Sequence, residues 1–172
     1  AAFVFWGQRT FIEYLLHSPN AGLRSRHLPA LLAGELAGAT GLSNAMKFLS
    51  GIESLSISAT PAGPGWRLDG HLPWVTNLRR PGFGVAAAVQ PTGGEPPAIV
   101  AFFDDTPGIH RSADLELLAL RGSNTAAIDI RGVASGPEHL IHADARSFIP
   151  TVRPGFLGLQ CGMAIGLARA SL

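Results

Sequence analysis

The spacing of apolar residues changes along the chain, and the change separates helical regions from strands. Apolar side chains recur at roughly helical spacing over residues 3–16 and again over residues 28–36. Over residues 55–60 apolar and polar side chains alternate, which is typical of a strand with one buried face. The helical spacing returns at residues 154–172, where a proline stands at the expected helix start. The pattern predicts helices, then strands, then a helix.

Further short strands are expected between the outer helices. They are separated by clusters of proline and glycine, and they are predicted at residues 66–70, 73–77, 85–90, 98–103 and 125–133. Several short strands at this spacing indicate a barrel or a sandwich. We therefore expect an α+β fold, in which a mainly antiparallel β-barrel or sandwich is flanked by helices.

Composition and charge exclude several classes of protein. Hydrophobic residues make up 47% of the chain and charged residues 15%, against roughly 25% charged in an average domain. Part of the surface is therefore expected to meet another domain, a subunit or a cofactor. The net charge of +1 is scattered, so neither nucleic-acid binding nor a basic membrane patch is indicated. Residues 155–168 form the most apolar stretch, which is too short to span a bilayer.

Cysteine content and the first residues bear on the compartment. The single cysteine, Cys161, excludes an internal disulfide framework and fits a reducing compartment, so we expect a cytoplasmic protein. Residues 1–6 carry no starting methionine, basic region or cleavage signature, and they do not resemble a signal peptide. We expect the chain to begin within a longer protein.

Three local patterns suggest chemistry that the surrounding sequence does not support. Residues 41–45 differ by one residue from the Gly-x-Ser-x-Gly elbow of serine hydrolases, but no βαβ pattern surrounds them, so Ser43 is interpreted as a cap or turn serine. His139 and His142 suggest a metal site, yet a loop is expected there and no third ligand is fixed by the spacing. Asp104 and Asp105 are interpreted as turn residues, because Thr-Pro-Gly follows them.

The pair Trp74 and Thr76 offers a different kind of site. Residues two apart on a strand face the same side, so one tryptophan ring and one hydroxyl would be presented together. A flat aromatic cofactor such as an isoalloxazine ring needs an apolar face and a few placed hydrogen-bond donors. Taken alone, a strand tryptophan is more often part of the core.

The sequence around this pair resembles the acyl-CoA dehydrogenase family. Residues 65–70, Gly-Trp-Arg-Leu-Asp-Gly, and residues 73–77, Pro-Trp-Val-Thr-Asn, resemble the family's Gly-Tyr-x-Leu-x-Gly turn and its Trp-Ile-Thr-Asn signature. Residues 120–133 resemble the family's Gly-x-Arg-x-Ser-x-Thr run and the strand after it. Residues 153–154, Arg-Pro, resemble the start of the C-terminal helical bundle, and residues 28–35 resemble the end of the N-terminal helical domain.

The resemblance implies a domain organisation and a reaction. Residues 1–38 would end an N-terminal helical domain, residues 39–147 would form the middle flavin-binding domain, and residues 148–172 would begin the C-terminal helical domain. The family binds FAD and desaturates acyl-CoA thioesters: a base removes the α proton while hydride leaves the β carbon for flavin N5. The resemblance also implies a homo-oligomer at full length, while the electron-transfer partner stays open.

The resemblance also assigns roles to particular residues. Trp74 would cover one face of the flavin, the Thr76 hydroxyl would reach N5, and Val75 belongs to the same cofactor-binding motif. Thr40 matches the threonine of the family's Thr-Glu-Pro loop at the flavin edge, and Arg153 matches an arginine that contacts substrate in relatives. The family's catalytic glutamate lies in the C-terminal helical domain, so no residue of this chain is assigned as the base.

Two departures from the family pattern keep other functions open. Gly-Leu follows Thr40 where the family usually has Glu-Pro, and Pro150 stands where an aspartate is common. The altered loop motivates one alternative, a flavin-dependent monooxygenase or oxidase of the same fold. The other alternative is a non-catalytic β module whose apolar surface serves assembly.

Overall fold

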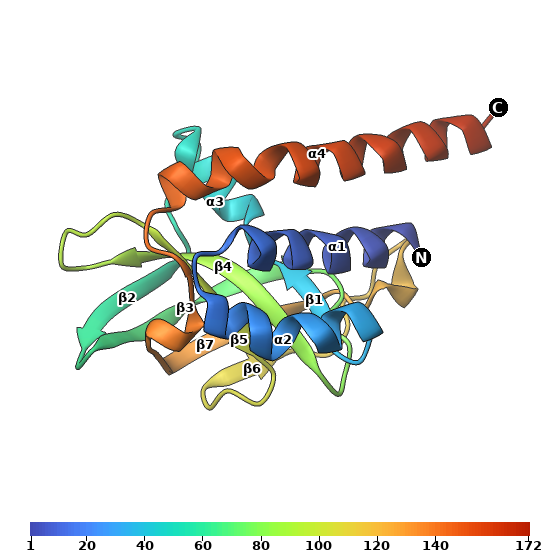
Figure 1. Ribbon diagram of the computed structural model, residues 1–172. Helices are drawn as coiled ribbons and strands as arrows, with labels where there is room; N and C mark the ends of the chain where they lie inside the picture. The colour runs from blue at the N-terminus through green and yellow to red at the C-terminus, as the bar shows by residue number, and fades with distance from the viewer.

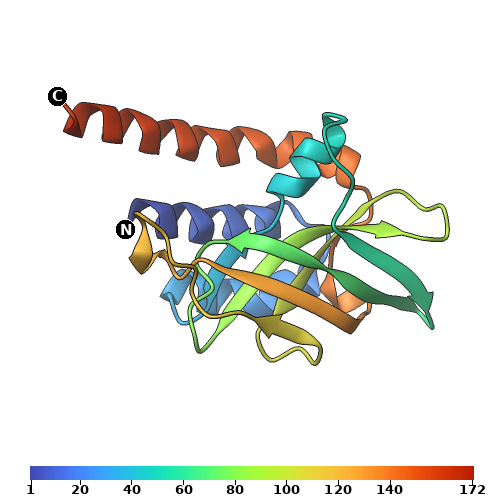
Figure 2. The same cartoon turned by 180° about the vertical axis from the view of Figure 1, so that it is seen from behind.

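The computed structural model describes all residues from 1 to 172, and it has four α-helices on one side of a curled sheet (Figure 1). The helices are α1 (Ala2–His17), α2 (Ala21–Ala33), α3 (Ser43–Leu49) and α4 (Ala145–Ala170). The strands are β1 (Ala37–Thr40), β2 (Ile57–Ala62), β3 (Gly65–Val75), β4 (Phe83–Pro91), β5 (Ala98–Phe103), β6 (Ile109–Arg111), β7 (Ala126–Ser135) and β8 (Leu140–His142). Seen from behind, the strands lie in front of the helices, and α4 extends beyond the sheet alongside α1 (Figure 2).

The sheet is mixed, with antiparallel pairs predominating. Its strand order is β6-β7-β3-β2-β4-β5-β8, and β1 pairs with β4 outside this path. The pairs β1–β4 and β2–β4 are parallel, whereas all the other pairs are antiparallel. The expected α+β class with a mainly antiparallel, curled sheet is confirmed.

Two hydrophobic clusters hold the fold together. One lies within the curl of the sheet and includes Leu68, Val85 and Ile128. The other lies between the sheet and the helices and includes Phe11 and Phe148. Strand β4 contributes to both clusters, because its alternate residues face opposite sides of the sheet. Helix α1 therefore has a fixed position above the strands that bear the site.

Several boundaries differ from the sequence-based expectation. The helix expected at residues 28–36 is α2, which begins at Ala21 because the Asn20 side chain caps it, accepting a hydrogen bond from Leu23 N at 3.0 Å. Pro29 therefore lies inside α2. The strands expected at residues 66–70 and 73–77 merge into one strand, β3, which ends at Val75.

The C-terminal helix also begins earlier than expected. It starts at Ala145, where the Asp144 side chain accepts a hydrogen bond from Arg146 N, so Pro150 and Pro154 lie inside it. Strand β1 begins at Ala37, two residues before the expected start of the middle domain at residue 39. None of the helices has the length and apolar character needed to cross a membrane.

Candidate functional site

A cleft of about 640 Å³ opens where the end of β3, strand β1 and the N-terminal part of α1 meet α4. Its lining is half apolar, and the residues are Phe3, Trp6, Thr40, Ser43, Trp74, Thr76, Glu116, Leu117, Leu118, Ala119, Leu120, Thr125 and Gln160. Three residues expected to bind a cofactor, Thr40, Trp74 and Thr76, therefore lie in one cleft.

A bulge in β3 turns Trp74 into the cleft. Leu72 pairs with Ile128 and Val75 pairs with Ala126, so three steps along β3 match two steps along β7. The extra residue interrupts the alternation of the strand and re-aims a side chain. Trp74 is consequently 67% exposed, whereas Val75 is buried in the core and could meet a ligand only through its backbone.

Thr76 is held by a chain of buried hydroxyls. Its Oγ1 lies 3.0 Å from Thr125 Oγ1, which lies 2.7 Å from Ser123 Oγ. The backbone between the two segments is also joined, because Asn77 N donates to Ser123 O at 2.9 Å. The Thr76 hydroxyl therefore has a fixed position at the edge of the cleft, beside the strand that carries Trp74.

A buried tyrosine on α1 fixes the position of the Thr40 hydroxyl. Tyr14 lies on α1 with no exposed surface, and its phenol oxygen lies 2.8 Å from Thr40 Oγ1. Burial raises the pKa of the Tyr14 phenol far above its usual range, and the hydrogen bond with Thr40 opposes this only in part. The phenol stays protonated wherever the protein is folded.

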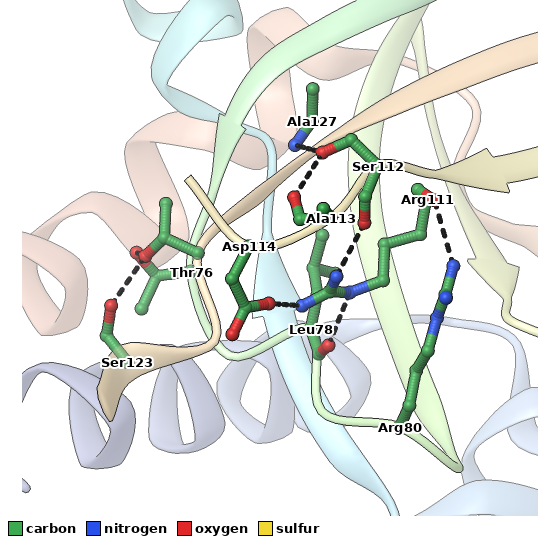
Figure 3. A network of polar contacts seen from close by, with 10 residues as sticks. Thr76, Leu78, Arg80, Arg111, Ser112, Ala113, Asp114, Ser123 and Ala127 are labelled. Carbon is green, nitrogen blue, oxygen red and sulfur yellow. Dashed lines mark hydrogen bonds and ion pairs between the residues drawn. The ribbon is translucent and has the colours of Figure 1, made fainter. Parts of the chain in front are cut away.

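One wall of the cleft is an irregular segment, residues 112–120, and Arg111 anchors its start (Figure 3). The Arg111 guanidinium donates from Nε to Leu78 O at 2.8 Å and from Nη1 to Ser112 O at 2.6 Å, and it also pairs with Asp114. Ser112 Oγ in turn accepts a hydrogen bond from Ala127 N at 3.1 Å. The wall is therefore tied both to the segment after β3 and to β7.

The helices supply the remaining lining. Trp6 on α1 donates from Nε1 to Phe156 O on α4 at 3.2 Å, and the two rings meet edge to face. This contact fixes the helices relative to each other, so that Phe3 and Gln160 also reach the cleft. Sequence reasoning missed these residues and the wall at 116–120. The apolar run Leu117-Leu118-Ala119-Leu120 was the available signal, because such a run is unusual in a loop.

Arg153 does not lie with the other expected site residues. It lines a separate groove of about 410 Å³ between α3 and α4, together with Lys47. The structure thus brings Thr40, Trp74 and Thr76 together and places Arg153 apart from them.

The other candidate chemistries find no support in the geometry. A strand does precede Ser43, but no histidine lines either cavity that Ser43 lines. His139 and His142 accept hydrogen bonds from nearby backbone N–H groups, and no group of three or more potential metal ligands forms. Asp104 lies in the turn after β5, as expected, and accepts a hydrogen bond from Gly82 N at 2.7 Å.

Comparison with known proteins finds similar sequences among the acyl-CoA dehydrogenases, the family that the motifs resemble. No family model matches the chain. The chain is 29% identical over 121 residues to mitochondrial isovaleryl-CoA dehydrogenase of Pongo abelii, covering 68% of this chain and 28% of that protein. It is 26% identical over 157 residues to the probable acyl-CoA dehydrogenase YngJ of Bacillus subtilis, covering 87% of this chain and 40% of that protein.

Solved structures share the fold. A glutaryl-CoA dehydrogenase from Mycobacterium smegmatis, in complex with FADH2, matches with a TM-score of 0.71 and 21% identity, covering 88% of this chain and 40% of that one. PigA with FAD and proline matches with a TM-score of 0.71 and 19% identity, covering 91% and 43%. This chain resembles acyl-CoA dehydrogenases in both sequence and fold. The resemblance expected from the motifs is confirmed, and the chain spans less than half the length of these acyl-CoA dehydrogenase relatives.

Proposed function

We propose that this chain forms the flavin-binding part of an FAD-dependent acyl-CoA dehydrogenase. The observation that carries the proposal is the convergence of an exposed tryptophan and two threonine hydroxyls on one cleft with an apolar wall. An isoalloxazine ring has a flat apolar face and a polar edge, and this donor set fits both. Structures of the same fold that contain FAD or FADH2 support the choice of cofactor.

In this proposal the cleft would hold FAD, and the chemistry that FAD would supply is acceptance of the hydride that leaves the β carbon of an acyl thioester. Trp74 would provide the surface on which the ring lies, and Thr40 and Thr76 would orient its polar edge. Residues 117–120 would add an apolar wall beside the ring. The chain thus contributes orientation, which is a usual contribution of the protein in flavin enzymes.

The identity of the base lies outside this assignment. Glu116 is the only carboxylate that lines the cleft, and its side chain is exposed and makes no hydrogen bond or ion pair. It therefore lacks the burial that would tune a carboxylate as a general base. We assign no residue of this chain to proton abstraction.

The proposal also names a substrate class, acyl-CoA. Lys47 and Arg153 line the groove between α3 and α4, and cations of this kind suit the phosphates of coenzyme A. The relatives named isovaleryl-CoA and glutaryl-CoA dehydrogenase support the same substrate class. We propose Arg153 as a substrate contact on this basis.

A second candidate is a flavin-dependent oxidase or monooxygenase of the same fold. It is motivated by Gly41 and Leu42, which replace the usual Glu-Pro after Thr40. A third possibility, a β module without a cofactor, predicts that no flavin binds at all.

The test is FAD binding followed by a choice of electron acceptor. We expect the protein that contains this chain to bind FAD and turn yellow, and to reduce a dye when an acyl-CoA is added. Reaction only with oxygen would favour the second candidate. A protein that stays colourless after FAD is added would overturn both flavin proposals.

A further inference from the structure

Three threonines line the cleft, and two of them, Thr40 and Thr76, have other hydroxyls of the protein behind them. Tyr14 lies behind Thr40, with 2.8 Å between the oxygens. Thr125 lies behind Thr76 at 3.0 Å, and Ser123 lies behind Thr125 at 2.7 Å. Each hydroxyl has one hydrogen to donate, so the number of available acceptors decides which way each O–H points.

Counting the hydrogen-bond donors and acceptors around Thr40 leaves one direction for each O–H. Tyr14 has no exposed surface and no hydrogen-bond partner besides Thr40, so its O–H must donate to Thr40 Oγ1 or be left without an acceptor. Leu42 N also donates to Thr40 Oγ1, at 3.3 Å. Both lone pairs of Thr40 Oγ1 are then occupied. Its own hydrogen is free to point into the cleft, which Thr40 lines.

The donors and acceptors near Thr76 can be counted in the same way. Ser123 is buried, and its hydroxyl has Thr125 as its only partner. The hydrogen of Ser123 therefore has only Thr125 as an acceptor. Thr76 and Thr125 both line the cleft, so one of them donates to the other and the remaining hydrogen points into the cleft.

We infer that Tyr14 and Ser123 are positioning residues: Tyr14 fixes Thr40, and Ser123 fixes the pair Thr76 and Thr125, as hydrogen-bond donors to the occupant of the cleft. The direction of the hydroxyls depends on the protein alone, whereas the identity of the occupant rests on the proposed function. A ring edge that presents acceptors matches this arrangement. An N–H group facing Thr40 does not, because both lone pairs of that hydroxyl are occupied.

The direction of the hydroxyls can be tested without any ligand. Neutron diffraction from a deuterated crystal locates the deuterium on each hydroxyl. We expect the Tyr14 deuterium to lie toward Thr40 and the Ser123 deuterium toward Thr125. A Thr40 deuterium that points toward the Tyr14 oxygen, or a Ser123 deuterium that points away from Thr125, would overturn the inference.

The consequence for binding can be tested with two variants and a control. Tyr14→Phe and Ser123→Ala each free an acceptor position behind a cleft threonine while keeping its side chain. We expect each to lower the affinity for FAD by about threefold to tenfold, the effect of one net hydrogen bond. Ser18→Ala removes an equally buried hydroxyl that bonds Ile141 O far from the cleft, and it should leave the affinity for FAD unchanged.

The outcomes distinguish the inference about Tyr14 and Ser123 from the proposal that the cleft binds FAD. A wild-type protein that binds FAD, with both variants folded and their affinities for FAD unchanged, would overturn the inference and leave the proposed function standing. A wild-type protein that does not bind FAD would overturn the proposed function, and the deuterium positions would still decide the inference. If Tyr14→Phe fails to fold, Ser123→Ala carries the test by itself.

Discussion

Trp74 lies two residues after the buried Leu72 on β3, yet Trp74 is 67% exposed and its neighbour Val75 only 1%. Regular alternation would bury Trp74 with Leu72, but the bulge opposite Ile128 and Ala126 adds a residue between Leu72 and Val75 and exposes Trp74. A large exposed aromatic ring contributes little to folding at this position. Its contribution is to whatever occupies the cleft.

Replacing Trp74 with alanine should separate binding from stability. Because the ring is mostly exposed, Trp74→Ala is expected to change the free energy of unfolding by no more than about 0.5 kcal/mol. Loss of the flat face should weaken FAD binding by about tenfold or more. Calorimetric titration with FAD and urea unfolding measure the two effects. Trp66, also on β3 but packed against the core within the sheet, is the control: Trp66→Ala should lower stability and spare FAD affinity.

Arg111 offers a test of the cleft wall. Its side chain is only 6% exposed and donates to two backbone carbonyls and to Asp114. Lysine keeps the charge but lacks the planar fork, so Arg111→Lys should cost about 2 kcal/mol of unfolding free energy. The exposed pair of Arg131 with Asp129 supplies the control, since Arg131→Lys should cost less than about 0.5 kcal/mol. If Arg111→Lys and Arg131→Lys lower the free energy of unfolding equally, the hydrogen bonds of Arg111 contribute no more to stability than an exposed ion pair.

The pattern of the strands was the most informative part of the sequence for the fold. The strand predicted at residues 98–103 matches β5, because the run is apolar throughout and is bounded by turn residues. Strands β6 and β8 were missed, because three residues are too few for alternation to show. The early start of α4 was missed because Pro154 was interpreted as the start of the helix, whereas α4 begins at Ala145.

The site was predictable only where local motifs describe it. Thr40, Trp74 and Thr76 were singled out by motif, and they share a cleft; their roles toward FAD stay predictions. The bulge that exposes Trp74 depends on pairing with β7, some fifty residues along the chain, and no local pattern reports it. Similarly, Tyr14 was assigned to a helix face, but its contact with Thr40 depends on how α1 packs on the sheet.

Two glycines should respond to alanine in opposite ways. A Cβ on Gly38 would lie 2.8 Å from Phe11 Cβ, where α1 crosses β1, so Gly38→Ala should cost about 1–3 kcal/mol through overpacking. A Cβ on Gly158 would meet nothing within 4 Å. Because alanine favours helices, Gly158→Ala should raise stability by about 0.5–1 kcal/mol. Thermal unfolding of both variants decides the matter, and a stabilising Gly38→Ala would contradict the packing of α1 on β1.

His27 should make the protein less stable in mild acid. Its ring stacks on Phe103 with 3.9 Å between ring centroids, and burial, followed by the nearby Arg26, lowers its pKa below the usual 6.5. Asp105 opposes this shift and His139 adds to it. The unfolded chain therefore takes up a proton near pH 6.5 while the folded protein does not, so stability falls as the pH drops from about 7 toward the lowered folded pKa.

The loss of stability in mild acid should disappear when the imidazole of His27 is removed. His27→Gln is expected to flatten the decrease in unfolding free energy between about pH 7 and pH 5, because glutamine takes up no proton in either state. Urea unfolding across this range measures the slope, and an NMR titration of the His27 ring protons gives its pKa directly. A ring that titrates at or above 6.5, together with an unchanged slope in the variant, would show that stacking on Phe103 does not disfavour the charged ring.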